Sequence, residues 1–154
     1  MKTIPLTQGK VALVDDEDFE FLNQWKWNAY RNNNTYYARR RIPGTNKKIT
    51  MHRQIADAPA GVLVDHKNGN GLDNQRSNLR KASKQQNGMN RRVGKNNKSG
   101  IVGVRVSKYR TWRCEIKLDG RSIYIGSFKK KSKAVKARKE AESKLFGEYG
   151  RSAP

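Results

Sequence analysis

The stretch VLVDHKNGNGLDNQRSNLRKASKQQN, from Val62 to Asn87, places an acid and a histidine side by side, Asp65 and His66, just ahead of a turn rich in Gly and Asn. The pair has two interpretations. It can belong to an ordinary hairpin, or it can be a metal ligand beside a general base, because carboxylates bind hard divalent cations and imidazole titrates near neutral pH. The remainder of the chain must decide between the two.

The residues around this pair predict the elements that would position it. VLVDH is typical of a short strand, KNGNGLDNQR of a turn and SNLRKA of the partner strand. Ser83 is then expected to cap a helix that begins KQQNGMNRR. This order places His66 at the end of a strand and Asn87 on the following helix, so both side chains could meet around one ion.

Residues 1 to about 60 predict a mixed α/β segment ahead of the hairpin. KVALV is expected to form a strand, and Asp15 or Asp16 to cap a short helix with Phe19 and Leu22 on one face. WKWNAYR and TYYARRRI are expected to form strands around the turn residues 32–34.

A second short helix is predicted in ITMHRQIADA, with Ile49, Met51 and Ile55 on it and Pro59 after its end. The same helix carries His52. Because His52 lies between Met51 and Ile55, we interpret it as a packing residue rather than a ligand.

Residues 100 to about 150 differ in character. GIVGVRVS, TWRCEIKL and RSIYIGSF alternate as strands do, and the DG between the last two indicates a tight hairpin turn. The alternation assigns two sets of side chains to opposite faces of the predicted sheet: Trp112, Cys114, Ile116 and Leu118, against Arg113, Glu115 and Lys117.

A helix is predicted after these strands, capped by Ser132 and ended by Gly147. Its expected buried stripe consists of Ala134, Ala137, Ala141 and Leu145. The helix should cover the apolar face of the sheet, with Cys114 as a small buried side chain there. The basic face is left to solvent or to DNA.

Charge is the strongest global feature of the sequence. In 154 residues, 34 Lys and Arg against 13 Asp and Glu give a formal net charge of +21, which favours a polyanionic partner, nucleic acid above all. A membrane surface is a weaker interpretation, because the basic helix predicted near the C-terminus has Ala rather than bulky apolar residues on its other side.

The composition also excludes several classes of protein. One cysteine permits no intrachain disulfide, and with two histidines it cannot complete a structural zinc site of the usual four Cys and His ligands. No apolar run approaches the roughly 18 residues of a spanning helix, and the N-terminus turns acidic before a signal-peptide core forms. We therefore expect a cytoplasmic protein without a membrane partner.

Both halves of the sequence resemble known families. VDHKNGNGLDNQRSNLR with Asn87 resembles the HNH homing endonucleases of phages and mobile introns, and IPLTQGKVALVDDEDFEFLNQWKW, YYARRR and MHRQI are similar to the leader of such phage enzymes. GVR, W-x-x-E-I, Y-I-G-S-F and the Ala-rich helix resemble the APETALA2-type DNA-binding module.

The resemblances imply an α+β fold in three parts. Residues 1–90 would form a ββα-metal (HNH) nuclease domain with an N-terminal α/β leader, residues 91–99 a basic linker, and residues 100–150 an APETALA2-like domain of three antiparallel strands plus one helix.

The HNH resemblance also implies roles for residues. His66 would be the general base, and Asp65 and Asn87 would hold one divalent ion, Mg²⁺, which Mn²⁺ could replace. Asn78, the middle Asn of the motif, is grouped with the catalytic residues but is interpreted as tying the two strands of the loop together rather than touching substrate. Asn87 stands where other HNH enzymes have His, a departure that the homing branch shares.

The APETALA2 resemblance implies that the outward face of the sheet contacts double-stranded DNA. The residues expected there are Arg105, Arg113, Glu115, Lys117 and Tyr124, with Arg121 close by.

Three functions compete at this stage: a metal-dependent DNA endonuclease of the homing type, nicking or cutting both strands, a DNA-binding regulator without enzymatic activity and with a relic HNH fold, and a basic RNA-binding structural protein. The intact His66 favours the endonuclease, and we expect it to act as a monomer.

Overall fold

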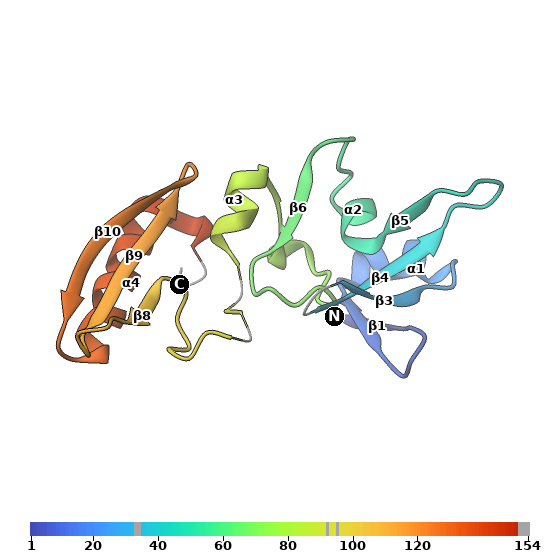
Figure 1. Cartoon of the computed structure of the whole chain (residues 1–154). Helices are drawn as coiled ribbons and strands as arrows, with labels where there is room; N and C mark the ends of the chain where they lie inside the picture. The colour runs from blue at the N-terminus through green and yellow to red at the C-terminus, as the bar shows by residue number, and fades with distance from the viewer. Residues whose placement is uncertain (33–34, 92, 95, 151–154) are drawn as a thin grey trace. The chain divides into compact units, whose positions relative to one another are not determined.

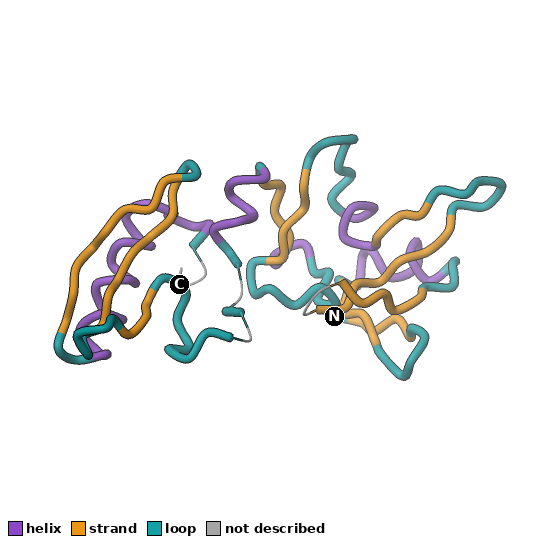
Figure 2. Tube along the Cα trace, in the orientation of Figure 1, coloured by secondary structure: helices purple, strands orange, loops and turns teal. Residues whose placement is uncertain are grey.

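The computed structural model describes residues 1–32, 35–91, 93–94 and 96–150 (Figure 1). The chain divides into two compact units, residues 1–87 and 88–154, and each is described by itself. Both are mixed α/β units with small sheets and few helices (Figure 2). None of the helices in these ranges is long and apolar enough to cross a membrane.

The first unit begins with two small antiparallel sheets and two short helices. In chain order these elements are β1 (Lys2–Pro5), β2 (Val11–Val14), α1 (Asp16–Asn23), β3 (Asn28–Asn32), β4 (Thr35–Arg41), β5 (Lys48–Thr50) and α2 (Met51–Ile55). β1 pairs with β2, and β4 lies between β3 and β5. The strands predicted at KVALV, WKWNAYR and TYYARRRI are therefore present, whereas β1 was not predicted, and residues 33 and 34 of the predicted turn lie outside the described ranges.

One hydrophobic core joins most of these elements. Its largest buried side chains come from strands, helices and the later hairpin: Ile4, Val14, Leu22, Trp27, Met51, Ile55 and Leu79. The indole N–H of Trp27 donates to the Leu22 carbonyl at 2.9 Å, so the polar atom of this buried ring is satisfied. The leader thus supplies most of the apolar material against which the hairpin packs.

Two predictions in this part of the chain need correction. Ile49 lies in β5, opposite Arg40 of β4, and the helix starts only at Met51, because residues 48–50 extend the sheet instead. Asp15 occupies the N-cap position of α1, as predicted, but its side chain does not bond to the helix. Its carboxylate instead accepts from the backbone N–H of Arg76 at 2.7 Å.

The hairpin that carries Asp65 and His66 follows. β6 (Leu63–His66) pairs with β7 (Leu79–Ala82) in antiparallel register, a 3-10 turn covers Arg76–Asn78, and α3 (Lys84–Met89) comes next. The predicted cap on α3 is confirmed as a reciprocal pair. The Gln86 N–H donates to Ser83 Oγ at 3.1 Å, and the Ser83 N–H donates to Gln86 Oε1 at 2.8 Å.

The loop between β6 and β7 is bound to the leader through its backbone. The N–H of Leu13 donates to the Leu72 carbonyl, and the N–H of Asn74 donates to the Leu13 carbonyl, both at 2.8 Å. The N–H of Gly71 donates to Thr35 Oγ1 at 3.2 Å. These bonds attach the loop to β2 and to the start of β4. The loop is thereby fixed beside the end of β6, where His66 lies.

The second unit is a three-stranded antiparallel sheet with one long helix. The strands are β8 (Val104–Val106), β9 (Trp112–Leu118) and β10 (Arg121–Phe128), in the order β10-β9-β8, and α4 (Lys131–Phe146) lies across one face (Figure 1). Asp119 and Gly120 both have positive φ, as the DG turn predicted. Cys114 and Ile116 are buried under the helix, which confirms the predicted face.

The buried stripe of α4 differs from the prediction. Lys130, not Ser132, is the N-cap residue, and Leu145 is exposed. The residues that face the sheet are Ala134, Arg138, Glu142 and Phe146, in steps of four. The predicted stripe is confirmed at Ala134 but missed Arg138 and Glu142, because it assumed that charged residues point outward. These two side chains are buried and bond to each other at 2.9 Å.

Part of the predicted linker lies outside the described residues, at 92 and 95. Further along it, Asn97 and Ser99 form a hydrogen-bonded turn. Asn97 Oδ1 accepts from the Ser99 N–H at 2.9 Å and from its hydroxyl at 2.7 Å, and Ser99 is buried.

The loop gives a first testable prediction. A Cβ added at Gly71 would lie 2.4 Å from the Tyr36 carbonyl oxygen and 2.7 Å from the Tyr37 ring, so Gly71→Ala must displace the loop. We expect a loss of about 1–3 kcal/mol in the free energy of unfolding, measured by urea titration. Gly88→Ala on α3 meets nothing within 4 Å and is the matched control. Equal stability of both variants would contradict the tight seating of the loop.

Candidate functional site

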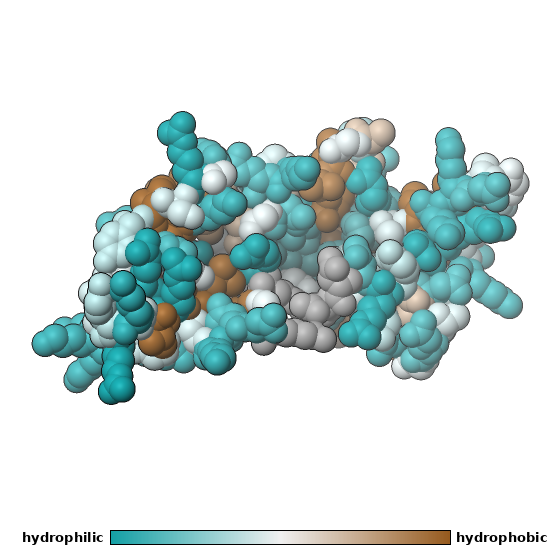
Figure 3. Space-filling view, in the orientation of Figure 1, coloured by the Kyte–Doolittle hydropathy of each residue, from teal (hydrophilic) through white to brown (hydrophobic). Residues whose placement is uncertain are grey.

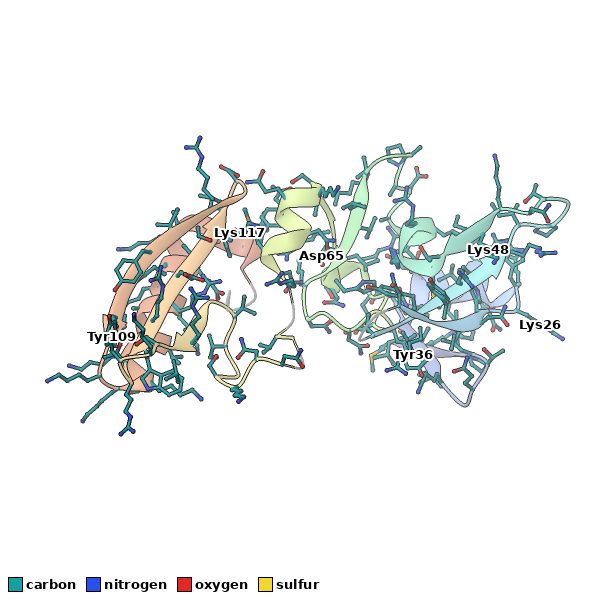
Figure 4. All side chains as sticks on the ribbon, in the orientation of Figure 1. Lys26, Tyr36, Lys48, Asp65, Tyr109 and Lys117 are labelled. Atoms are coloured by element: carbon teal, nitrogen blue, oxygen red, sulfur yellow. The ribbon has the colours of Figure 1, made fainter. Side chains whose placement is uncertain are left out.

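Asp65 forms a buried ion pair across the hairpin. It lies opposite Arg80 in the strand register, and Arg80 donates from Nε at 3.0 Å and from Nη2 at 2.7 Å to Asp65 Oδ2. Both side chains are 9% exposed. The guanidinium thus fixes the carboxylate on β6 and offsets its charge away from water. Figure 4 labels Asp65.

His66 is buried at the end of β6 among aromatic rings. It is 4% exposed, and its ring centroid lies 4.9 Å from that of His52 and 5.8 Å from that of Tyr37. Its Nε2 is 3.3 Å from Asn74 Oδ1. Burial lowers the pKa of His66 below its usual 6.5, although the Asn74 hydrogen bond and the Asp65 charge act in the opposite direction. The ring is therefore neutral at pH 7 and able to accept a proton.

His52 packs against His66, in agreement with its interpretation as a packing residue. Its Nε2 is 3.2 Å from Thr50 Oγ1, whereas its Nδ1 is buried without a hydrogen-bond partner in the described part of the chain. Burial, with smaller effects of His66 and Arg53, lowers the pKa of His52 to about 3. The ring is therefore neutral and cannot place a competing positive charge beside His66.

Asn78 ends the 3-10 turn just before β7 and bonds to the loop. Its Oδ1 accepts from the Asn68 N–H at 3.0 Å, and its Nδ2 donates to Asn68 Oδ1 at 3.1 Å and to the Asp73 carbonyl at 2.8 Å. These contacts close the loop on itself.

Asn87 lies on α3 with an exposed side chain, and its backbone N–H donates to the Ser83 carbonyl at 2.9 Å. Asp65 and His66 are neighbours on β6, but no bond joins Asn87 to either of them. The residue types nevertheless fit a hard divalent cation, because Asp65 and Asn87 both offer oxygen ligands.

A cluster of carboxylates on α1 serves a different purpose. Asp15, Glu17 and Asp18 lie close together, and the Arg76 side chain bonds to Asp18 at 2.6 Å and to Glu17 at 2.9 Å. A guanidinium therefore offsets their charge. The contacts join α1 to the 3-10 turn that precedes β7.

The sequence did not single out Arg80, Asn74 or the contact between His52 and His66. Arg80 could have been found, because a hairpin that pairs His66 with Leu79 necessarily pairs Asp65 with Arg80. Asn74 is one of several Asn in a polar turn, and no periodicity distinguishes it. The contact with His52 depends on tertiary packing.

In the second unit, the outward face of the sheet combines basic and aromatic side chains. Glu115 Oε2 accepts from Arg105 Nη2 and Arg113 Nε, both at 3.3 Å, and the Arg113 guanidinium lies 4.9 Å from the Tyr124 ring centroid. Lys117 and Arg121 are exposed toward the β9–β10 turn. Figure 4 labels Lys117 at this end of the sheet and Tyr109 at the other. Hydrophilic residues predominate on the face of the chain that Figure 3 shows.

The lowered pKa of His52 predicts a pH dependence of stability. Between pH 6.5 and 3 the unfolded chain binds a proton at this residue that the folded chain does not, so stability falls as the pH drops, by at most about 1.4 kcal/mol per pH unit for one proton. His52→Gln should lose less stability than the parent between pH 7 and pH 5 in urea unfolding. Identical losses would contradict the burial of a neutral ring.

Comparison with known proteins identifies the hairpin region. Residues 57–89 match the family model described as HNH endonuclease. The chain is 27% identical over 150 residues to "Uncharacterized HNH endonuclease L560" of Acanthamoeba polyphaga mimivirus, covering 92% of this chain and 74% of that protein. It is 38% identical over 81 residues to "Protein 3.8" of Escherichia phage T7, covering 49% and 67%. No solved structure matches. The chain therefore carries an HNH endonuclease domain and belongs to the same family as Protein 3.8 of phage T7.

Proposed function

We propose that this protein is a metal-dependent DNA endonuclease of the homing type that hydrolyses a phosphodiester bond with His66 as general base. The observation that carries the proposal is a neutral, buried imidazole held beside a carboxylate at the end of β6, within the residues that match the HNH family. An imidazole in that state accepts a proton near neutral pH.

In this proposal, His66 takes a proton from the attacking water. Asp65 and Asn87 would hold a divalent ion, Mg²⁺ or in its place Mn²⁺, which would supply positive charge to offset that of the scissile phosphate and the departing oxygen. Arg80 holds the Asp65 carboxylate in a fixed orientation on β6. Asn78 keeps the loop closed so that β6 and β7 stay in register.

The substrate in this proposal is double-stranded DNA, bound by a monomer. The net charge of +21 supports a polyanion, and the exposed Arg105, Arg113 and Tyr124 offer a basic and aromatic face of the kind that contacts DNA. The APETALA2-like assignment of residues 100–150 rests on the sequence motifs together with this sheet and helix. A role restricted to binding would explain the ion pair of Asp65 but would not require a buried neutral imidazole at His66.

The role of His66 predicts a separation of binding from cleavage. His66→Gln should leave DNA affinity within about twofold of the parent, while the single-turnover rate of cleavage falls by about 10²–10⁴-fold because the proton acceptor is lost. Circular dichroism should report an unchanged fold. A variant that cuts at the parental rate would refute the assignment.

Asp65 should behave differently from its neighbour. Asp65→Asn should weaken Mn²⁺ binding, measured by electron paramagnetic resonance of the free ion, while His66→Gln should change it little. An unchanged Mn²⁺ affinity in Asp65→Asn would contradict the proposed metal role.

The role of the outward face of the β10-β9-β8 sheet can be tested with charge-matched variants. Arg105→Gln/Arg113→Gln should weaken binding to cognate duplex by about 1–3 kcal/mol for each arginine that contacts a base edge. Lys136→Gln/Lys139→Gln removes the same charge from the exposed side of α4 and should have a much smaller effect. Equal losses in the two variants would mean that net charge, rather than this face, determines affinity.

A further inference from the structure

Asn74 is the most deeply buried polar residue near His66. It is 0% exposed although it lies in a Gly- and Asn-rich loop. Its backbone N–H donates to the Leu13 carbonyl of β2 at 2.8 Å. A buried polar side chain in an otherwise solvated loop requires specific partners, because leaving one unpaired costs about 1–3 kcal/mol.

The partners of Asn74 determine which way its amide group faces. Its Nδ2 donates to the Leu72 carbonyl at 3.2 Å, and a carbonyl oxygen can only accept. Oδ1 must therefore face the other side, where it lies 3.3 Å from Nε2 of His66. Turning the amide over would bring two oxygens together at Leu72 and lose the hydrogen bond to its carbonyl, so the Leu72 contact decides the orientation.

The orientation of the amide in turn determines the tautomer of His66. An amide oxygen only accepts, so Nε2 of His66 must carry the proton of this hydrogen bond. A neutral imidazole has one N–H, and its other nitrogen, Nδ1, then carries the lone pair. The surrounding His52 and Tyr37 rings restrict rotation of the His66 ring.

We infer that Asn74 is a positioning residue, which selects the Nε2–H tautomer of His66 and so makes Nδ1 the atom that accepts the proton from water. The inference rests on the proposed role of His66 as general base. The inference links the leader to the chemistry. A backbone hydrogen bond to β2 fixes Asn74, and Asn74 in turn bonds to Nε2 of His66. The resulting orientation of the ring determines where the lone pair of Nδ1 points.

The tautomer can be observed directly in the full chain without metal or DNA. The sequence has two histidines, so multiple-bond ¹H–¹⁵N correlation spectra contain two imidazoles, and His52→Gln assigns them. In the parent protein at pH 7.5 or above, we expect His66 to show a protonated Nε2 and an unprotonated Nδ1. The opposite tautomer in the parent would overturn the inference, whether or not any variant folds.

Variants test whether Asn74 is responsible. Asn74→Ala should yield a mixture of the two His66 tautomers and lower the single-turnover rate of DNA cleavage by about 10–100-fold, with DNA affinity unchanged. Asn70→Ala is the matched control, because Asn70 is exposed and bonds to the loop backbone rather than to His66. A slower Asn74→Ala whose His66 tautomer is unchanged would show a merely structural role and overturn the inference.

The outcome for the tautomer is distinct from the outcome for the proposed function. A parent protein that has the Nε2–H tautomer but cuts no DNA would support the tautomer selection and contradict the proposed endonuclease activity. A parent protein that cuts DNA but has the Nδ1–H tautomer would support the proposed endonuclease activity and overturn the inference.

Discussion

The backbone pairing of Leu13 with Leu72 and Asn74 is the constraint on which the site depends. β6 and β7 have four residues each, which is too little for a hairpin to be stable by itself. The loop that joins them is polar and has few apolar side chains to bury. Two backbone hydrogen bonds to β2 and the contacts of Arg76 with α1 therefore fix the loop, and His66 is buried as a consequence.

Among the described residues, each unit contains a buried pair of opposite charges: Asp65 with Arg80 in the first and Arg138 with Glu142 in the second. Only 34% of the residues are hydrophobic, so neither unit can build a large apolar core. Arg138 Nε also donates to the Val102 carbonyl at 2.8 Å, which ties the helix to the segment before β8. Such pairs add little net stability but are costly to break singly, so they fix one arrangement of strand, loop and helix.

Local signals were sufficient for much of the fold. The DG turn, the Ser83 cap and the alternation in TWRCEIKL all depend on residues close in sequence, and the structure has each of them. The partners of Asp65 and His66 depend on strand register and tertiary packing. The loop between β6 and β7 is fixed by contacts up to 61 residues apart, such as that between Asp15 and Arg76. The stripe on α4 was mispredicted because two residues of opposite charge that bond to each other can be buried together. Residue type alone does not indicate such a pair.

We propose that the chain cuts DNA with a site built on β6, β7, α3 and the leader. Cleavage of long natural duplex DNA and of supercoiled plasmids carrying such duplexes, with Mg²⁺ and then with excess chelator, tests this claim most directly. We predict discrete nicks or breaks that require the ion and stop when it is chelated, while DNA remains bound. Stable binding with no cleavage in Mg²⁺ or Mn²⁺ at any pH between 6 and 9 would contradict it.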